Sequence, residues 1–183
     1  MQKKIIFISG TIGSGKTTLS KKLVNSIPNS VMLDGDWCFQ QGYNWYFDSE
    51  TKQMAINNII YLLNSYLSNS NFEYIIFCWT LHKKETIEQI LTSLNYDGDT
   101  IFYHFSLLCN DKTLESRIAN RFEQMKNELG IAYNYYDIQH MLLGAIEKTP
   151  CYFTNDAIKL NGNSDLETLY NEIIEKINLE KKT

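Results

Sequence analysis

The chain has 183 residues, of which 44% are hydrophobic and 21% charged, a composition typical of one folded domain with a substantial core. Its 17 basic and 21 acidic residues give a net charge of −4, which argues against nucleic acid as a partner held by a basic surface. No apolar run approaches the roughly 18 residues that a membrane span needs. The four cysteines lie far apart without a Cys-x-x-Cys pair, so we expect a cytoplasmic protein with reduced thiols and no membrane partner.

The hydrophobic pattern predicts strands and helices that alternate along the chain. Residues 4–9 form a short apolar run that ends at a glycine, the signal of a buried strand. Residues 16–27 are amphipathic and stop before Pro28, which predicts the first helix. Further strands are expected at 31–33, 74–79, 100–109 and 157–160, and further helices at 51–67, 83–94, 112–128 and 135–147, with a last helix opened by a capping box of Ser164 and Glu167.

Strands separated by helices imply a parallel sheet, because each parallel crossover places a helix on one face of the sheet. No internal repeat and no linker-like stretch interrupts this pattern. The sequence therefore predicts an α/β fold of three layers in a single domain that spans residues 1–183.

Residues 10–17 read Gly-Thr-Ile-Gly-Ser-Gly-Lys-Thr, which satisfies the Walker A pattern G-x-x-x-x-G-K-[ST]. The glycines let successive backbone N–H groups point into one anion-sized hollow, and the helix that follows presents its positive end to the same phosphates. A chance match in such a chain has a probability of order one in a hundred, and the flanking strand and helix reduce it further. The pattern predicts that Lys16 reaches the β- and γ-phosphates and that Thr17 binds Mg²⁺, and the nucleotide-binding set is Gly13, Ser14, Gly15, Lys16, Thr17 and Thr18.

With this motif and its element order, the chain resembles the P-loop kinases, a family of small phosphotransferases. The resemblance covers nearly the whole chain in element order, while identical residues concentrate in three short motifs. It implies a five-stranded parallel sheet, a helical lid at about 117–147 and an acceptor-binding region at about 36–72. It also implies ATP and Mg²⁺ as cofactors and a small-molecule acceptor as the second partner.

Two carboxylates, Asp34 and Asp36, follow the second expected strand in the sequence Asp-Gly-Asp. Ligands of an open parallel sheet sit at the carboxyl ends of its strands, so both side chains can face the phosphates. The pair is similar to the D-G-D of adenylylsulfate kinases, the D-x-D of shikimate kinase and the single aspartate of chloramphenicol phosphotransferase. This resemblance implies that Asp36 is the catalytic base and that Asp34 organises Mg²⁺ through water.

Two observations limit that interpretation. Adenylylsulfate kinases continue with an arginine that holds their anionic substrate, and Phe39 stands at that position here, so adenylylsulfate is a poor candidate. The Asp-Gly-Asp segment is also a good polar turn, and capping of a following helix is the alternative interpretation.

Only two of the 17 basic residues are arginines, Arg117 and Arg121, and their spacing places them on one face of a helix. The segment Arg-Ile-Ala-Asn-Arg resembles the start of the lid in adenylate kinase. By that resemblance Arg117 stacks on adenine, and Arg121 is a catalytic residue that reaches the β- and γ-phosphates. A planar, permanently charged guanidinium suits both tasks. The alternative is a solvated helix face with Glu115 and Glu123 as ion partners.

The expected acceptor region is aromatic and contains no arginine. Its side chains Trp37, Phe39, Tyr43, Trp45, Tyr46 and Phe47 fall within eleven residues, together with Cys38. Such a wall suits a flat or partly apolar acceptor, and the missing arginines argue against a nucleoside monophosphate as acceptor. The alternative is that these rings pack the loop onto the helix at 51–67.

Other segments complete the interpretation. The third expected strand carries no acid for Mg²⁺, and the histidine that follows it, His82, fits a helix start better than a substrate contact. The tyrosines of 130–136 are candidates to close over the acceptor, and residues 161–163 occupy the place where the family lines adenine with backbone groups.

The sequence therefore predicts an ATP-dependent kinase that transfers the γ-phosphate to a hydroxyl of a small neutral or aromatic acceptor. Two alternatives remain open at this point. One is a nucleoside or nucleotide kinase, and the other is a regulatory protein that binds ATP without a diffusible acceptor.

Overall fold

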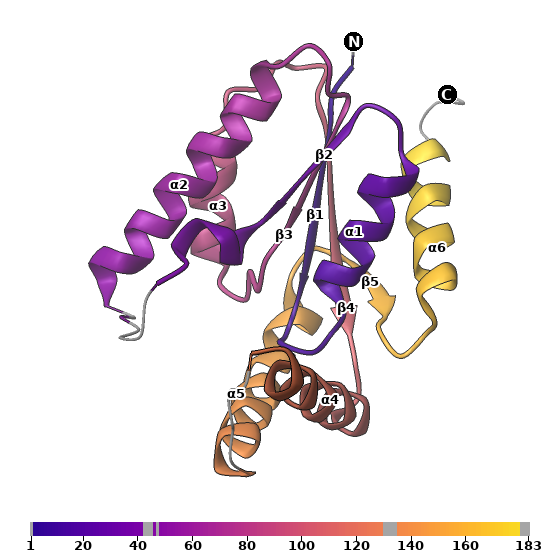
Figure 1. Cartoon of the computed structure of the whole chain (residues 1–183). Helices are drawn as coiled ribbons and strands as arrows, with labels where there is room; N and C mark the ends of the chain where they lie inside the picture. The colour runs from indigo at the N-terminus through magenta and orange to yellow at the C-terminus, as the bar shows by residue number, and fades with distance from the viewer. Residues whose placement is uncertain (1, 42–45, 47, 130–134, 180–183) are drawn as a thin grey trace.

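The computed structural model describes residues 2–41, 46, 48–129 and 135–179. Its five strands form one parallel sheet in the order β2-β3-β1-β4-β5 (Figure 1). The strands are β1 (Lys4–Gly10), β2 (Ser30–Asp34), β3 (Tyr74–Cys78), β4 (Ile101–Leu108) and β5 (Ile158–Asn161). The helices are α1 (Lys16–Ser26), the 3₁₀ helix η1 (Gly35–Phe39), α2 (Ser49–Ser68), α3 (Lys84–Thr92), α4 (Asp111–Leu129), α5 (Tyr135–Thr154) and α6 (Leu166–Leu179).

Helices cover both faces of the sheet. The alternation of side chains along β1 sends Ile6 and Ile8 into a core with α1 and α6, and Ile5 and Phe7 into a second core with α2 and α3. All four side chains are at most 1% exposed, as expected for a central parallel strand. The three-layer α/β fold predicted from the sequence is confirmed.

The helices α4 and α5 lie below the carboxyl ends of β1 and β4 and form a third small core (Figure 1). Leu114, Ile118 and Phe122 of α4 pack against Leu142 and Ala145 of α5. This hairpin therefore stands at the edge of the sheet where a parallel α/β fold binds its ligands. None of the described helices has the length and apolarity needed to cross a membrane.

Two elements differ from the sequence prediction because single residues override the local pattern. The turn after β2 winds into η1, which Asp34 caps by accepting a hydrogen bond from the Asp36 N–H. The helix α5 was expected to end at residue 147 but continues through Pro150 to Thr154. A proline removes only one N–H donor, and the buried Tyr152 holds the last turn against the sheet.

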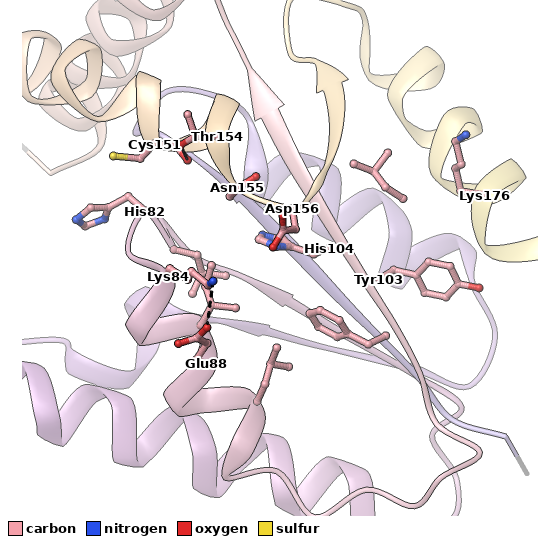
Figure 2. A pocket seen from close by; sticks show the side chains of 15 residues that line it. His82, Lys84, Glu88, Tyr103, His104, Cys151, Thr154, Asn155, Asp156 and Lys176 are labelled. Carbon is pink, nitrogen blue, oxygen red and sulfur yellow. Dashed lines mark hydrogen bonds and ion pairs between the residues drawn. The ribbon is translucent and has the colours of Figure 1, made fainter.

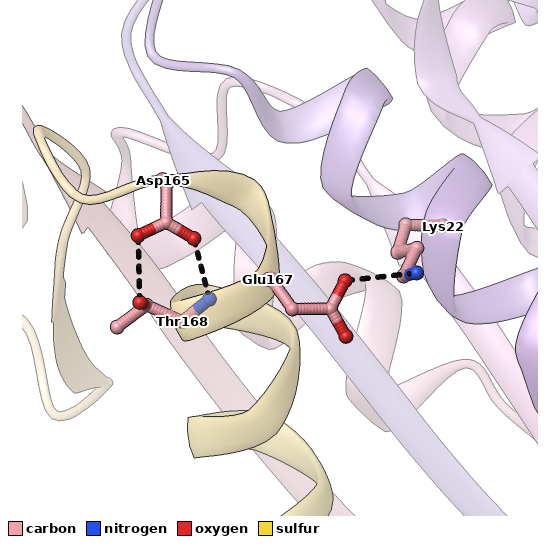
Figure 3. A network of polar contacts seen from close by, with 4 residues as sticks. All are labelled: Lys22, Asp165, Glu167 and Thr168. Carbon is pink, nitrogen blue, oxygen red and sulfur yellow. Dashed lines mark hydrogen bonds and ion pairs between the residues drawn. The ribbon is translucent and has the colours of Figure 1, made fainter.

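The start of α6 corrects the predicted capping box. Asp165, not Ser164, caps the helix, because its two carboxylate oxygens accept hydrogen bonds from the N–H (2.9 Å) and the hydroxyl (2.8 Å) of Thr168 (Figure 3). Glu167 does not reach back to the cap and instead pairs with Lys22 of α1 at 3.0 Å. The cap is shifted by one residue, and the glutamate joins the two helices of one layer.

Exchange of the two neighbouring residues tests this correction. Asp165→Ala should lower the thermal unfolding midpoint by a few degrees, because it removes both bonds to Thr168. Ser164→Ala is the matched control and should leave the midpoint unchanged. The hydrogen bonds from Thr168 hold the pKa of Asp165 below its usual range, so its stabilisation is present above pH about 4 and is lost as the pH falls through the lowered pKa. Equal midpoints for the two variants at pH 7 would contradict the assignment.

Candidate functional site

The loop that follows β1 stands at the switch point of the sheet, because β1 lies between β3 and β4. Gly13 and Gly15 adopt φ angles of 79° and 98°, in the left-handed region that other residues rarely enter. Gly10 has no room for a side chain, since a Cβ there would lie 2.6 Å from Ser14 Oγ. The backbone of the loop is thus wound as the phosphate-binding motif predicts.

Lys16 extends along this loop, and its Nζ donates to the Thr11 carbonyl at 2.8 Å. Burial lowers the pKa of Lys16, while the charges of Asp36 and Asp34 act in the opposite direction. Ser14 Oγ is buried in the same loop without a hydrogen-bond partner. A buried hydroxyl without a partner is uncommon in folded proteins, and this one lies in the loop whose glycine pattern predicts an anion site. Thr18, by contrast, is exposed on α1.

Asp34 joins the loop to the segment after β2. Its Oδ2 accepts a hydrogen bond of 2.8 Å from the Thr17 hydroxyl, and its Oδ1 accepts one of 3.1 Å from the Asp36 N–H. The Asp34 side chain is 5% exposed, so both hydrogen bonds are largely shielded from solvent. The two residues predicted to serve the metal are therefore in direct contact. The alternative of a helix cap also holds, since one oxygen does cap η1.

Asp36 is held by a residue that the sequence did not single out. The indole Nε1 of Trp79 donates to Asp36 Oδ1 at 3.1 Å. The ring of Trp79 lies so close to Gly35 that a Cβ there would be 2.4 Å from the indole Cγ. Burial and the nearby charge of Asp34 raise the pKa of Asp36, while Lys16 and the Trp79 bond lower it. The position of Trp79, one residue beyond β3, was the only sequence signal for this contact.

The end of β3 carries a thiol where many P-loop proteins carry an acid. Cys78 is the register partner of Asp34 in the β2–β3 pair and is 1% exposed. Burial raises the pKa of Cys78 to about 12, with Asp34 as the second cause, so the group stays a neutral thiol. The hard oxygen atoms beside Cys78 that could hold Mg²⁺ are those of Thr17 and Asp34, and this pair fits an ion that prefers one or two protein oxygens and several waters.

One of the two arginines of α4, Arg117, contacts the phosphate-binding loop. Arg117 donates to the Ser14 carbonyl at 3.1 Å and to Cys109 Sγ at 3.5 Å. Arg121 lies exposed one turn further along α4, and its charge is the smallest of the causes that act on the pKa of Lys16 and of Asp36. In the described part of the chain neither arginine forms an ion pair with Glu115 or Glu123. The contact of Arg117 with the loop thus disagrees with a purely solvated helix face.

Cys109 connects Arg117 to the turn after β5. A Cβ on Gly162 would lie 2.5 Å from Cys109 Sγ, and the Gly162 N–H donates to the Leu108 carbonyl at 2.8 Å. Asn163 accepts a hydrogen bond from the Asn110 N–H at 3.1 Å. The turn at 161–163 and Arg117 therefore flank one small region beside the loop.

Part of the aromatic acceptor region can be placed. Trp37 and Tyr46 are 54% and 58% exposed, whereas Phe39 packs edge-to-face on Trp79 at 6.3 Å between ring centroids. One ring of the aromatic segment therefore packs on the residue after β3, and two are presented to solvent. Tyr43, Trp45, Phe47 and Tyr133 lie outside the described residues, as do the side chains of Tyr135 and Tyr136.

His82 does not share the environment of Asp36. It lines a groove of about 770 Å³ between α3 and the end of α5, where it faces Cys151 and Thr154 (Figure 2). No residue of the phosphate-binding loop lines this groove. His104 lies at its floor and makes a 2.9 Å bond to Ser9. Burial lowers the pKa of His104 to about 4, so both its bond and its neutral charge fit a structural role.

Comparisons with known proteins agree with this geometry. Solved structures with the same fold include a sugar kinase from Janibacter sp. HTCC2649 (TM-score 0.68, 11% identity, 97% of this chain and 95% of that one). They also include a gluconokinase from Sinorhizobium meliloti 1021 (0.61, 13%, 98% and 98%) and the tunicamycin resistance protein of Deinococcus radiodurans (0.59, 13%, 96% and 96%). No curated protein matches the sequence.

At these identities the likeness shows the fold alone, which is the three-layer α/β fold that the sequence predicted. A family model covers more: AAA_18, described as an AAA domain, matches residues 6–134, which is well over half of the 183 residues. The matched segment contains the phosphate-binding loop, both aspartates and both arginines. The chain therefore belongs to the AAA_18 family of P-loop domains.

Proposed function

We propose that the protein is an ATP-dependent phosphotransferase that moves the γ-phosphoryl group to a hydroxyl of a small uncharged acceptor. One observation carries the proposal. Lys16, Thr17, Asp34 and Asp36 meet at the carboxyl edge of the sheet, and each has a distinct partner that fixes it. A nucleotide-binding protein without an acceptor has no need for a second carboxylate that an indole holds beside the phosphate-binding loop.

The chain's own residues divide the work. The loop N–H groups and Lys16 bind the phosphates, and Arg121 offsets the charge that develops on the transferred group. Asp36 accepts the hydrogen bond of the acceptor hydroxyl through the oxygen that Trp79 leaves free, and so orients it toward the phosphorus. Thr17 and Asp34 would hold Mg²⁺, which when bound would neutralise part of the phosphate charge.

The acceptor side favours an uncharged compound. In the described part of 36–72, Lys52 is the only cationic side chain, and it lies exposed on α2. Phosphorylated acceptors are commonly held by arginine forks, which this region lacks. The exposed Trp37 and Tyr46 instead provide ring surface for a partly apolar or flat molecule. These features support a sugar-like, nucleoside-like or aromatic hydroxyl compound over a nucleoside monophosphate.

A labelled-phosphate assay tests the function directly. The protein is incubated with Mg²⁺ and ATP that carries labelled γ-phosphate, together with panels of uncharged hydroxyl compounds and of nucleoside monophosphates. The proposal expects a labelled product from the uncharged panel that Asp36→Asn does not make. Transfer to monophosphates alone would favour a nucleotide kinase, and ATP binding without any transfer would favour the regulatory alternative.

Lys16→Ala tests the nucleotide site. A ligand at 100 times its dissociation constant stabilises a protein by about 2.7 kcal/mol, so ATP binding is visible as a raised unfolding midpoint. We expect most of that ATP-dependent rise to disappear in Lys16→Ala, because the variant loses the charge beside the phosphates. Lys21→Ala, an exposed lysine on the same helix, is the control and should respond as the unmodified chain does. An undiminished rise in Lys16→Ala would count against the assignment of the loop.

The two aspartates should fail in different ways. Asp36→Asn keeps the shape of the side chain but cannot take a proton, so we expect kcat with an acceptor to fall about 100-fold or more while ATP binding stays nearly intact. Asp34→Asn should shift the Mg²⁺ dependence and impair both hydrolysis and transfer. The measurement is a Mg²⁺ titration of activity in both variants. The opposite pattern, with Asp36→Asn near the unmodified rate and Asp34→Asn inactive at saturating Mg²⁺, would exchange the two roles.

A further inference from the structure

The helix α5 contains a proline close to its C-terminal end. Pro150 lies inside the helix, where it removes one backbone donor and its ring presses on the carbonyl four residues earlier. Such a residue bends or loosens a helix locally. Two residues further on, Tyr152 is fully buried, at 0% exposure. The last turn of α5 is thus fixed to the sheet. The part of the helix before Pro150 joins this turn at a position where one helix hydrogen bond is missing.

Tyr152 fixes this turn through one hydrogen bond. Its hydroxyl donates to the Thr80 carbonyl at 2.5 Å, and burial raises the pKa of Tyr152, so the group keeps the proton that it donates. Thr80 directly follows Trp79, whose indole holds Asp36. Figure 2 shows the same meeting of elements from the groove side, where Cys151 and Thr154 of α5 face His82 of the loop after β3.

The other helix of the α4–α5 hairpin carries the arginines. Ile118 and Phe122 of α4 pack on Leu142 and Ala145 of α5, so the two helices behave as one packed unit. This unit meets the phosphate-binding loop through Arg117, which donates to the Ser14 carbonyl. Arg121 lies one turn beyond Arg117 on the same helix, so a change in the direction of α5 would move it relative to the loop.

We propose that Tyr152 is a positioning residue, whose hydroxyl ties the arginine-bearing α4–α5 hairpin to the strand end that holds Asp36 and thereby places Arg121 at the γ-phosphate. The proposal rests on the phosphotransferase function above. It assigns a role to a residue some thirty positions beyond Arg121 that touches neither nucleotide nor acceptor. Its effect must therefore appear through Arg121, which separates it from a general loss of stability.

The affinity for a non-hydrolysable ATP analogue relative to ADP measures this placement, because only the analogue carries a γ-phosphate. Both dissociation constants are measured by calorimetry with Mg²⁺. Arg121→Lys should lower the analogue-to-ADP preference about tenfold, the worth of one hydrogen bond between charged groups. Tyr152→Phe, which removes only the hydroxyl, should lower it by a similar factor. The double variant should fall no further than Arg121→Lys alone.

Tyr170→Phe is the matched control, since Tyr170 lies on α6 beside Lys22 and away from the hairpin. It should leave the preference unchanged. The unfolding midpoint of each variant is recorded, and only folded variants enter the comparison. Pro150→Ala is a second variant that restores the missing donor and does not weaken the helix; it should change the preference at least about twofold by redirecting the hairpin.

The outcomes separate the two proposals. An unmodified chain that binds neither nucleotide overturns the phosphotransferase function together with the role of Tyr152. Normal nucleotide binding with an unchanged preference in Tyr152→Phe and Pro150→Ala overturns only the positioning role. Additive losses in the Arg121→Lys and Tyr152→Phe double variant also overturn it, since they would show that Tyr152 acts independently of Arg121.

Discussion

The rest of the site depends on the two hydrogen bonds that the carboxylate of Asp34 accepts. One oxygen accepts a hydrogen bond from the Thr17 hydroxyl at the start of α1, and the other accepts one from the Asp36 N–H at the start of η1. The first helix after the phosphate-binding loop and the first turn of the acceptor region are thus joined through one largely buried side chain. A buried carboxylate is costly unless its oxygens are satisfied, so this geometry tolerates little displacement of either partner.

The surrounding charges follow from this arrangement. Lys16 is the cation that Asp34 and Asp36 share, and each of these carboxylates raises its pKa against the effect of burial. Trp79 adds a neutral donor to Asp36 without adding charge. Arg121 adds a positive charge from a separate helix, which acts to lower the pKa of Asp36. Two carboxylates and a lysine at one sheet edge suit a reaction in which phosphate charge is moved between oxygens.

The sequence predicted the parts of this site that rest on local patterns. The Walker A loop, the aspartate pair and the shared face of Arg117 and Arg121 are all set by spacing within a few residues, and the structure places them at one sheet edge. The three-layer fold could also be predicted from the sequence, because the apolar run of 4–9 and the amphipathic run of 16–27 each have the hydrophobic pattern of one type of element. The roles of these residues stay proposals.

The contacts that the sequence did not reveal join residues far apart in the chain. The bond from Trp79 to Asp36 depends on the neighbouring positions of β2 and β3 and on the missing side chain of Gly35. The last turn of α5 lies beyond Pro150, which locally signals a helix end, and is held by a hydroxyl whose acceptor, Thr80, is 72 residues away. Asp165 and Ser164 are both good caps, so local chemistry alone could not choose between them.

A crystal structure with Mg²⁺ and a non-hydrolysable ATP analogue tests the central claim most directly. The account predicts that the Thr17 hydroxyl turns from Asp34 Oδ2 to the metal, that Asp34 faces the same ion directly or through water, and that Asp36 stays on Trp79 with its free oxygen toward the γ-phosphate. Phosphates bound away from the loop of residues 10–17, or a metal held without Thr17 and Asp34, would contradict it.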